Sequence, residues 1–143
     1  SLPVKSMIHF FEEHLIARQL CDDMRDIEED LNSGRLSFVL SDSLFRLDLG
    51  TQIYLKTLKK LKKDILEIFW NKGISAVADI ALSHIEQAYR ALSELRGSCD
   101  VSLFEPLISH DKELLIDAKR EMHTVRTFFR YFDEPFTPLY MKD

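Results

Sequence analysis

Apolar residues recur at intervals of three and four positions along almost the whole chain, which is the spacing of side chains on one face of an α-helix. Only four glycines and four prolines occur among 143 residues, so long stretches contain nothing that disfavours a helix. These features predict an all-α protein, a helical bundle of four long helices plus one or two short ones. A chain of this length is most simply one domain, and we expect residues 1–143 to form a single all-helical segment.

The ends of the helices are predicted from glycines and prolines. We expect long helices over residues 3–31, 52–71, 75–95 and 111–132. Three glycines should end the first three of them: Gly34, Gly73 and Gly97. A short helix is expected within 35–51, and one or two turns within 103–110, interrupted by Pro106. The tail, 133–143, contains two prolines and should be extended.

The composition argues against several classes of function. The net charge of −5 disfavours nucleic acid as a partner, because phosphate binding needs a basic surface. No apolar run approaches the roughly 20 residues of a transmembrane helix. The two cysteines, Cys21 and Cys99, have no zinc-site spacing and are too few for a disulfide scaffold. We therefore expect reduced thiols and a cytoplasmic protein.

The segment from Gln19 to Phe38 has the most unusual composition. It places six acidic residues within nine positions: Asp22, Asp23, Asp26, Glu28, Glu29 and Asp30. Neighbouring like charges repel one another, and acids near the C-terminus of a helix also oppose its dipole. The segment is therefore either a solvated acidic helix end or a site that receives a cation.

On one continuous helix, the acidic residues and the apolar residues would separate onto two faces. One face carries the apolar stripe that should face the core: Ile16, Leu20, Met24, Ile27 and Leu31. The other carries Asp22, Asp26, Glu29 and Asp30. Toward the N-terminus this second face continues through Ile8, Phe11 and Leu15. It is therefore apolar at one end and rich in carboxylates at the other, which would suit an apolar tail attached to a phosphate and held through Mg²⁺.

At these positions the chain resembles a known family. Residues 19–26, Gln-Leu-Cys-Asp-Asp-Met-Arg-Asp, match the QxxDDxxD pattern of the second aspartate-rich motif of trans-prenyl diphosphate synthases. Gly34 and Arg35 follow, as a Gly-Arg pair does in the related squalene and phytoene synthases. The resemblance implies the class I isoprenoid synthase fold, an all-α bundle around a central cavity, and the activity of a Mg²⁺-dependent prenyltransferase.

The resemblance also implies a role for each residue of the motif. Asp22 and Asp26 would be Mg²⁺ ligands, with Asp23 as a third. Gln19 would be a polar contact, and the Arg35 guanidinium would face the diphosphate of an isoprenoid substrate. The metal would stabilise the leaving diphosphate as an allylic cation forms in an apolar cavity.

The family also has a first aspartate-rich motif on an earlier helix, and these 143 residues contain none. The chain is then either part of a longer synthase or a reduced relative, and we expect the former. By itself it should turn over no prenyl substrate. Its apolar strip should be covered either in a homo-oligomer or by a missing N-terminal half. The alternative from another class is a non-catalytic helical interaction module with a solvated acidic helix end.

Overall fold

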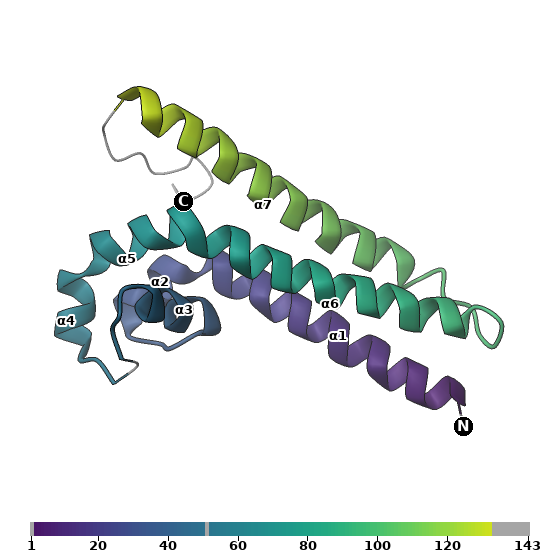
Figure 1. The fold of residues 1–143 in the computed structure, drawn as a ribbon. Coiled ribbons are helices and arrows are strands. Elements are labelled where there is room, and N and C mark those ends of the chain that lie inside the picture. Colours follow the sequence, from purple (N-terminus) through teal and green to yellow (C-terminus); the bar gives the residue numbers. More distant parts are fainter. Residues whose placement is uncertain (1, 51, 133–143) are drawn as a thin grey trace.

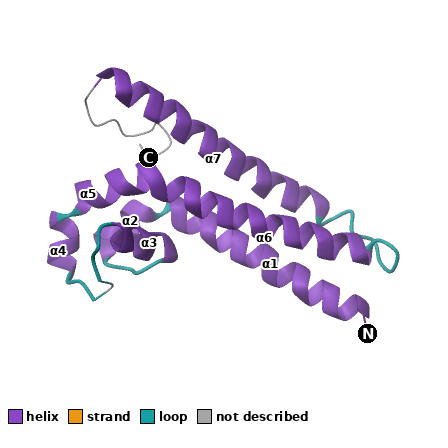
Figure 2. Ribbon diagram, in the orientation of Figure 1, coloured by secondary structure: helices purple, strands orange, loops and turns teal. Residues whose placement is uncertain are grey.

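The computed structural model describes residues 2–50 and 52–132, and these are helical or loop, without a strand. Long helices lie alongside one another, with a group of short ones at one end (Figures 1 and 2). The long helices are α1 (Leu2–Arg25), α6 (Ile74–Leu95) and α7 (Glu105–Phe132). The short ones are α2 (Ile27–Ser33), α3 (Phe38–Arg46), α4 (Leu55–Lys60) and α5 (Lys62–Ile68), followed by one π-helical turn, η1 (Phe69–Gly73). The predicted all-α bundle is confirmed.

Helix α6 lies between α1 and α7 and runs antiparallel to both (Figure 1). Four of its nine buried residues are alanines, including Ala78, Ala81 and Ala88, and at these positions neighbouring helices can approach closely. Glu13 of α1 accepts a 2.5 Å hydrogen bond from the ring of His84 on α6. These contacts join α1 and α6 into the main layer of the bundle.

Helix α7 is fixed to α1 through one buried carboxylate. The Asp111 side chain is 1% exposed and lies 2.9 Å from Nε2 of His14 and 3.1 Å from Nη1 of Arg18. The side chains of α1 that point toward α7 are therefore His14 and Arg18, and the opposite edge of α1 remains open to solvent.

Two of the four predicted long helices are wrong in their extent. The helix expected over 3–31 is broken at Asp26, where α1 ends and α2 begins. The helix expected over 52–71 starts later, bends at Leu61, and does not stop at Gly73. Gly73 has φ −63° and continues the helix, because the wide π-helical turn absorbs the bend between α5 and α6. Gly34 acts as the predicted stop, with φ 73° after Ser33. The helix expected to end before Gly97 also ends as predicted, at Leu95.

The C-terminal part also differs from the expectation. Pro106 is the second residue of α7 and does not interrupt it, because the first turn of a helix needs no proline N–H. The tail expected to be extended, 133–143, lies outside the described residues. Within the described ranges, no helix is long and apolar enough to cross a membrane.

Candidate functional site

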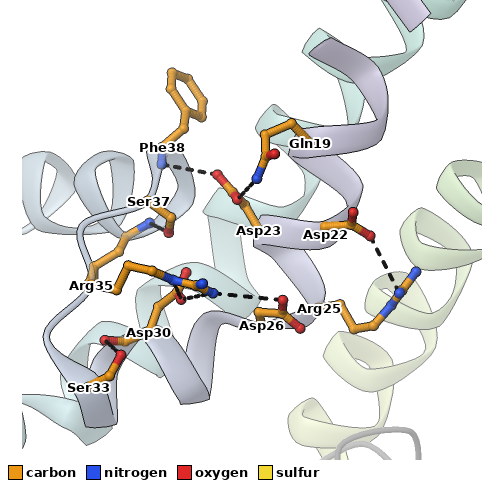
Figure 3. Close-up of polar contacts among 11 residues, drawn as sticks. Gln19, Asp22, Asp23, Arg25, Asp26, Asp30, Ser33, Arg35, Ser37 and Phe38 are labelled. Atoms are coloured by element: carbon orange, nitrogen blue, oxygen red, sulfur yellow. Dashed lines mark hydrogen bonds and ion pairs between the residues drawn. The ribbon is translucent and has the colours of Figure 1, made fainter. Parts of the chain in front are cut away.

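The break at Asp26 divides the acidic segment between two helices (Figure 3). Asp22 and Asp23 lie in the last turn of α1, where the helix dipole disfavours them. Glu28, Glu29 and Asp30 lie instead in the first turn of α2, where the dipole favours negative charge. The unfavourable accumulation of charge inferred from one continuous helix is therefore limited to the end of α1.

Asp23 holds the start of α3. One of its carboxylate oxygens accepts a 2.7 Å hydrogen bond from the Gln19 side-chain amide, and the other accepts a 3.2 Å bond from the backbone N–H of Phe38. Ser37, the N-cap residue of α3, accepts from the backbone N–H of Leu40. Since Asp23 is only 9% exposed and both of its oxygens are engaged, its contacts in this structure are those of a helix cap.

Asp30 is the buried anchor of the loop after α2. It is 0% exposed, and its Oδ1 accepts a 2.6 Å hydrogen bond from Nε of Arg35 and forms an ion pair with Nη2 of Arg35, also at 2.6 Å. Its backbone oxygen accepts from the N–H groups of Gly34 and Arg35, which close the end of the helix. Hydrogen bonding to Asp30, followed by its negative charge, raises the pKa of Arg35 further above its ordinary value. The Oδ2 atom of Asp30 is buried and has no hydrogen-bond partner among the described residues.

Asp22 and Asp26 differ from the other two aspartates in their exposure. Both side chains are 41% exposed, and they lie one helical turn apart, with the N–H of Asp26 bonded to the backbone oxygen of Asp22. Asp22 is 3.5 Å from Arg25, and Asp26 is 3.9 Å from Arg35. Exposed ion pairs at these distances contribute little to stability. These two carboxylates are therefore available to an external ligand.

The structure brings all five predicted site residues into one neighbourhood (Figure 3). Arg35 lies beside Asp26, and Gln19 contacts Asp23. Asp22 is on the adjacent turn and pairs with Arg25 in place of Arg35. Gln19 is itself exposed, and through its hydrogen bond to Asp23 it positions a neighbouring carboxylate.

The sequence argument missed the role of Asp30. The helical period groups Asp30 with Asp22 and Asp26, but in the structure Asp30 is buried and paired with Arg35. Ile16, expected in the core, is 43% exposed, because Phe10 and Ala17 occupy the buried face of α1. In the sequence, the Gly34–Arg35 pair after the acidic residues was the feature that could have indicated this contact, since an arginine beyond a helix stop can reach back to a carboxylate in that helix.

The apolar end of α1 is open, as its spacing predicts. Val4, Ile8, Phe11 and Leu15 are 56%, 53%, 41% and 61% exposed. They are separated by four, three and four positions and lead along the helix toward Asp22. We call these four residues the α1 strip. The ring of Phe11 touches Phe104 edge-on, with centroids 5.7 Å apart, which marks the border of the strip toward α7.

Cys21, inside the acidic segment, is a poor nucleophile. Burial, with the charges of Asp111 and Asp22 as smaller causes, raises the pKa of its thiol to about 11. A thiol is reactive as the thiolate, so Cys21 is chemically quiet at neutral pH. Cys21 and Cys99 are both free thiols, as the sequence predicts.

The carboxylate oxygens of Asp22 and Asp26 are of the type that binds Mg²⁺. Carboxylate oxygens are its preferred protein ligands, and Mg²⁺ is commonly held through one or two carboxylates together with substrate phosphates. Among the described residues no group of three or more His, Cys, Asp or Glu side chains could hold a metal ion. Asp22 and Asp26 therefore fit a shared site that phosphate oxygens complete, and not a site formed by protein ligands alone.

Comparison of the chain with protein-family models, with curated proteins and with solved structures finds no match. The candidate site therefore stands on its own geometry and on the motif in residues 19–35.

Proposed function

We propose that this chain belongs to a Mg²⁺-dependent isoprenoid diphosphate synthase and binds the diphosphate of an allylic substrate at the end of α1. The observation that carries this proposal is the pair of exposed carboxylates, Asp22 and Asp26, one turn apart and only loosely paired with arginines. The resemblance of residues 19–35 to the second aspartate-rich motif supplies the class of substrate. The intact enzyme would promote ionisation and condensation of prenyl groups.

Each residue of the site has a separate task in this proposal. Asp22 and Asp26 hold Mg²⁺, which supplies Lewis-acid stabilisation of the departing diphosphate when it is bound. Nε and Nη2 of Arg35 contact Asp30, and Nη2 also lies 3.9 Å from Asp26. The positive charge of Arg35 near Asp26 can therefore also attract phosphate. Asp23 and Gln19 fix the end of α1 against α3 and thereby orient the exposed pair.

The α1 strip supports the apolar part of the substrate. It lies on the same helix as the exposed pair and precedes it by two to five turns, so a prenyl tail could follow the helix away from the carboxylates. An apolar wall also limits the access of water to a carbocation.

A second candidate function is a non-catalytic helical interaction module. Two of the four aspartates at the site, Asp23 and Asp30, make contacts that would stabilise the fold without any ligand. In that case Asp22 and Asp26 are solvated charges, and the α1 strip is a protein-binding surface. The two candidates differ in their dependence on metal and diphosphate.

Thermal unfolding with Mg²⁺ and inorganic pyrophosphate separates the candidates. A ligand that binds only the folded chain, present at a hundred times its Kd, stabilises it by about 2.7 kcal/mol. We expect an increase in Tm with both components, a much smaller one with either alone, and none in Asp22→Asn/Asp26→Asn.

The matched control is Glu113→Gln/Asp117→Asn on α7. These two acids are also exposed and one turn apart, and Asp117 also pairs with an arginine, Arg120, at 3.0 Å. This variant should keep the full increase in Tm. An equal increase in both double variants, or none in the wild-type chain, would favour the interaction module.

A further inference from the structure

We propose that the α1 strip is the contact surface of an antiparallel homodimer, in which α1 packs against α1 of a second copy. The strip has the spacing of a coiled-coil seam, alternating four and three positions from Val4 to Leu15. Its four side chains are 41% to 61% exposed in the single chain, although they are apolar. The dimer needs neither metal nor diphosphate to form, and because it covers the strip, the second copy and the prenyl tail of the proposed function exclude each other there.

The charges beside the strip decide which partner fits. Lys5 and Glu12 follow Val4 and Phe11 directly, so both lie on the same flank, one heptad apart. Both are exposed, and neither forms an ion pair with a described residue. When a second copy runs antiparallel, with Ile8 opposite the partner's Phe11, the flank that carries Lys5 and Glu12 lies against the same flank of the partner. Lys5 of each copy then lies nearest to the partner's Glu12.

This complementarity occurs twice, because a two-fold axis repeats each contact. In a parallel arrangement each flank would face the opposite flank of the partner. That opposite flank, next to α7, presents Met7 and His14 and carries neither a carboxylate nor a lysine. His14 is already bonded to Asp111. The charges therefore favour a second copy in the antiparallel orientation.

The strip ends at Leu15, because the next seam position is Arg18, which is bonded to Asp111. The contact is accordingly short, spanning about three helical turns. Interfaces of this small size are weak and dissociate on dilution. We expect a monomer–dimer equilibrium that is visible in the micromolar range.

Sedimentation velocity over a range of concentrations, without Mg²⁺ or diphosphate, tests the proposal. Leu15→Glu should make the chain monomeric while its circular dichroism stays unchanged, since Leu15 is 61% exposed and its replacement leaves the core intact. Ile116→Glu is the matched control, because Ile116 is 39% exposed on α7, outside the strip, and this variant should dimerise like the wild type.

A charge exchange tests the orientation. Lys5→Glu and Glu12→Lys should each weaken the dimer about threefold to tenfold, because each places like charges opposite one another twice. The double variant Lys5→Glu/Glu12→Lys should recover most of the affinity, since the pairs re-form with reversed sign. A monomeric wild-type chain at the highest concentration, a dimer lost equally in Ile116→Glu, or no recovery in the exchange variant would overturn the proposal.

Discussion

The four aspartates around the end of α1 form two pairs with opposite environments. Asp23 and Asp30 are buried and accept hydrogen bonds from α3 and from Arg35. Asp22 and Asp26 are 41% exposed and are paired at 3.5 and 3.9 Å. Identical side chains within nine positions therefore divide into two that stabilise the fold and two that can receive a ligand. Burial and the number of hydrogen bonds separate them, whereas charge and spacing do not.

The largest expected contrast between a buried and an exposed group concerns the two thiols. At pH 8 the exposed Cys99 should react with a thiol reagent on the order of a hundredfold faster than Cys21, whose pKa of about 11 leaves little thiolate. The ratio should shrink as the pH rises toward that value. Time-resolved thiol titration measures both rates, and in urea the two should become similar. Equal rates in the folded chain would show that the end of α1 is open to solvent.

The two arginines should differ in their effect on stability. Arg35→Ala leaves the buried Asp30 carboxylate without its donors, so we expect Tm to fall by roughly 5 °C. Arg25→Ala removes only the exposed pair with Asp22 and should leave Tm nearly unchanged. Calorimetry on both variants gives the comparison. A similar Tm for the two would mean that Asp30 finds other donors, and the division into buried and exposed pairs would be weaker.

Loss of Asp23 should have an intermediate effect. Asp23→Ala frees the Phe38 N–H and the Gln19 amide, and the expected loss is about 1–2 kcal/mol in the free energy of unfolding. Urea titration measures it. Since α3 is the element held by this carboxylate, amide exchange should accelerate first in Phe38–Arg46. Uniform acceleration over the whole chain would contradict the assignment of Asp23 as the cap of that helix.

The smallest effect on stability is expected at the exposed pair. Asp22→Asn and Asp26→Asn should each change the free energy of unfolding by less than about 0.5 kcal/mol, with a slight gain for Asp22→Asn because an acid is removed from the end of a helix. The same variants should lose the response to Mg²⁺ and pyrophosphate. Urea titration without ligand provides the measurement, and a loss comparable to that of Asp23→Ala would give these residues a structural role instead.

The sequence by itself determined the fold class and much of the core. Leu20, Met24, Ile27 and Leu31 are buried as their spacing predicts, and Ile8, Phe11 and Leu15 lie on an exposed face. Gly34 ends its helix in the left-handed conformation that glycine adopts easily. These features depend on local geometry, namely the helical period and the backbone preferences of single residues, and a sequence reports both directly.

Only the tertiary structure decided which carboxylates are available. The helical period places residues on the faces of a helix, but it does not say which of those faces α3 and the loop after α2 will cover. Asp30 is buried against Arg35, and Asp23 accepts a hydrogen bond from the N–H of Phe38, fifteen positions away. The bend at η1 likewise carries the helix through Gly73. Contacts between separate helices fix each of these outcomes, and the spacing of residues along one helix does not contain them.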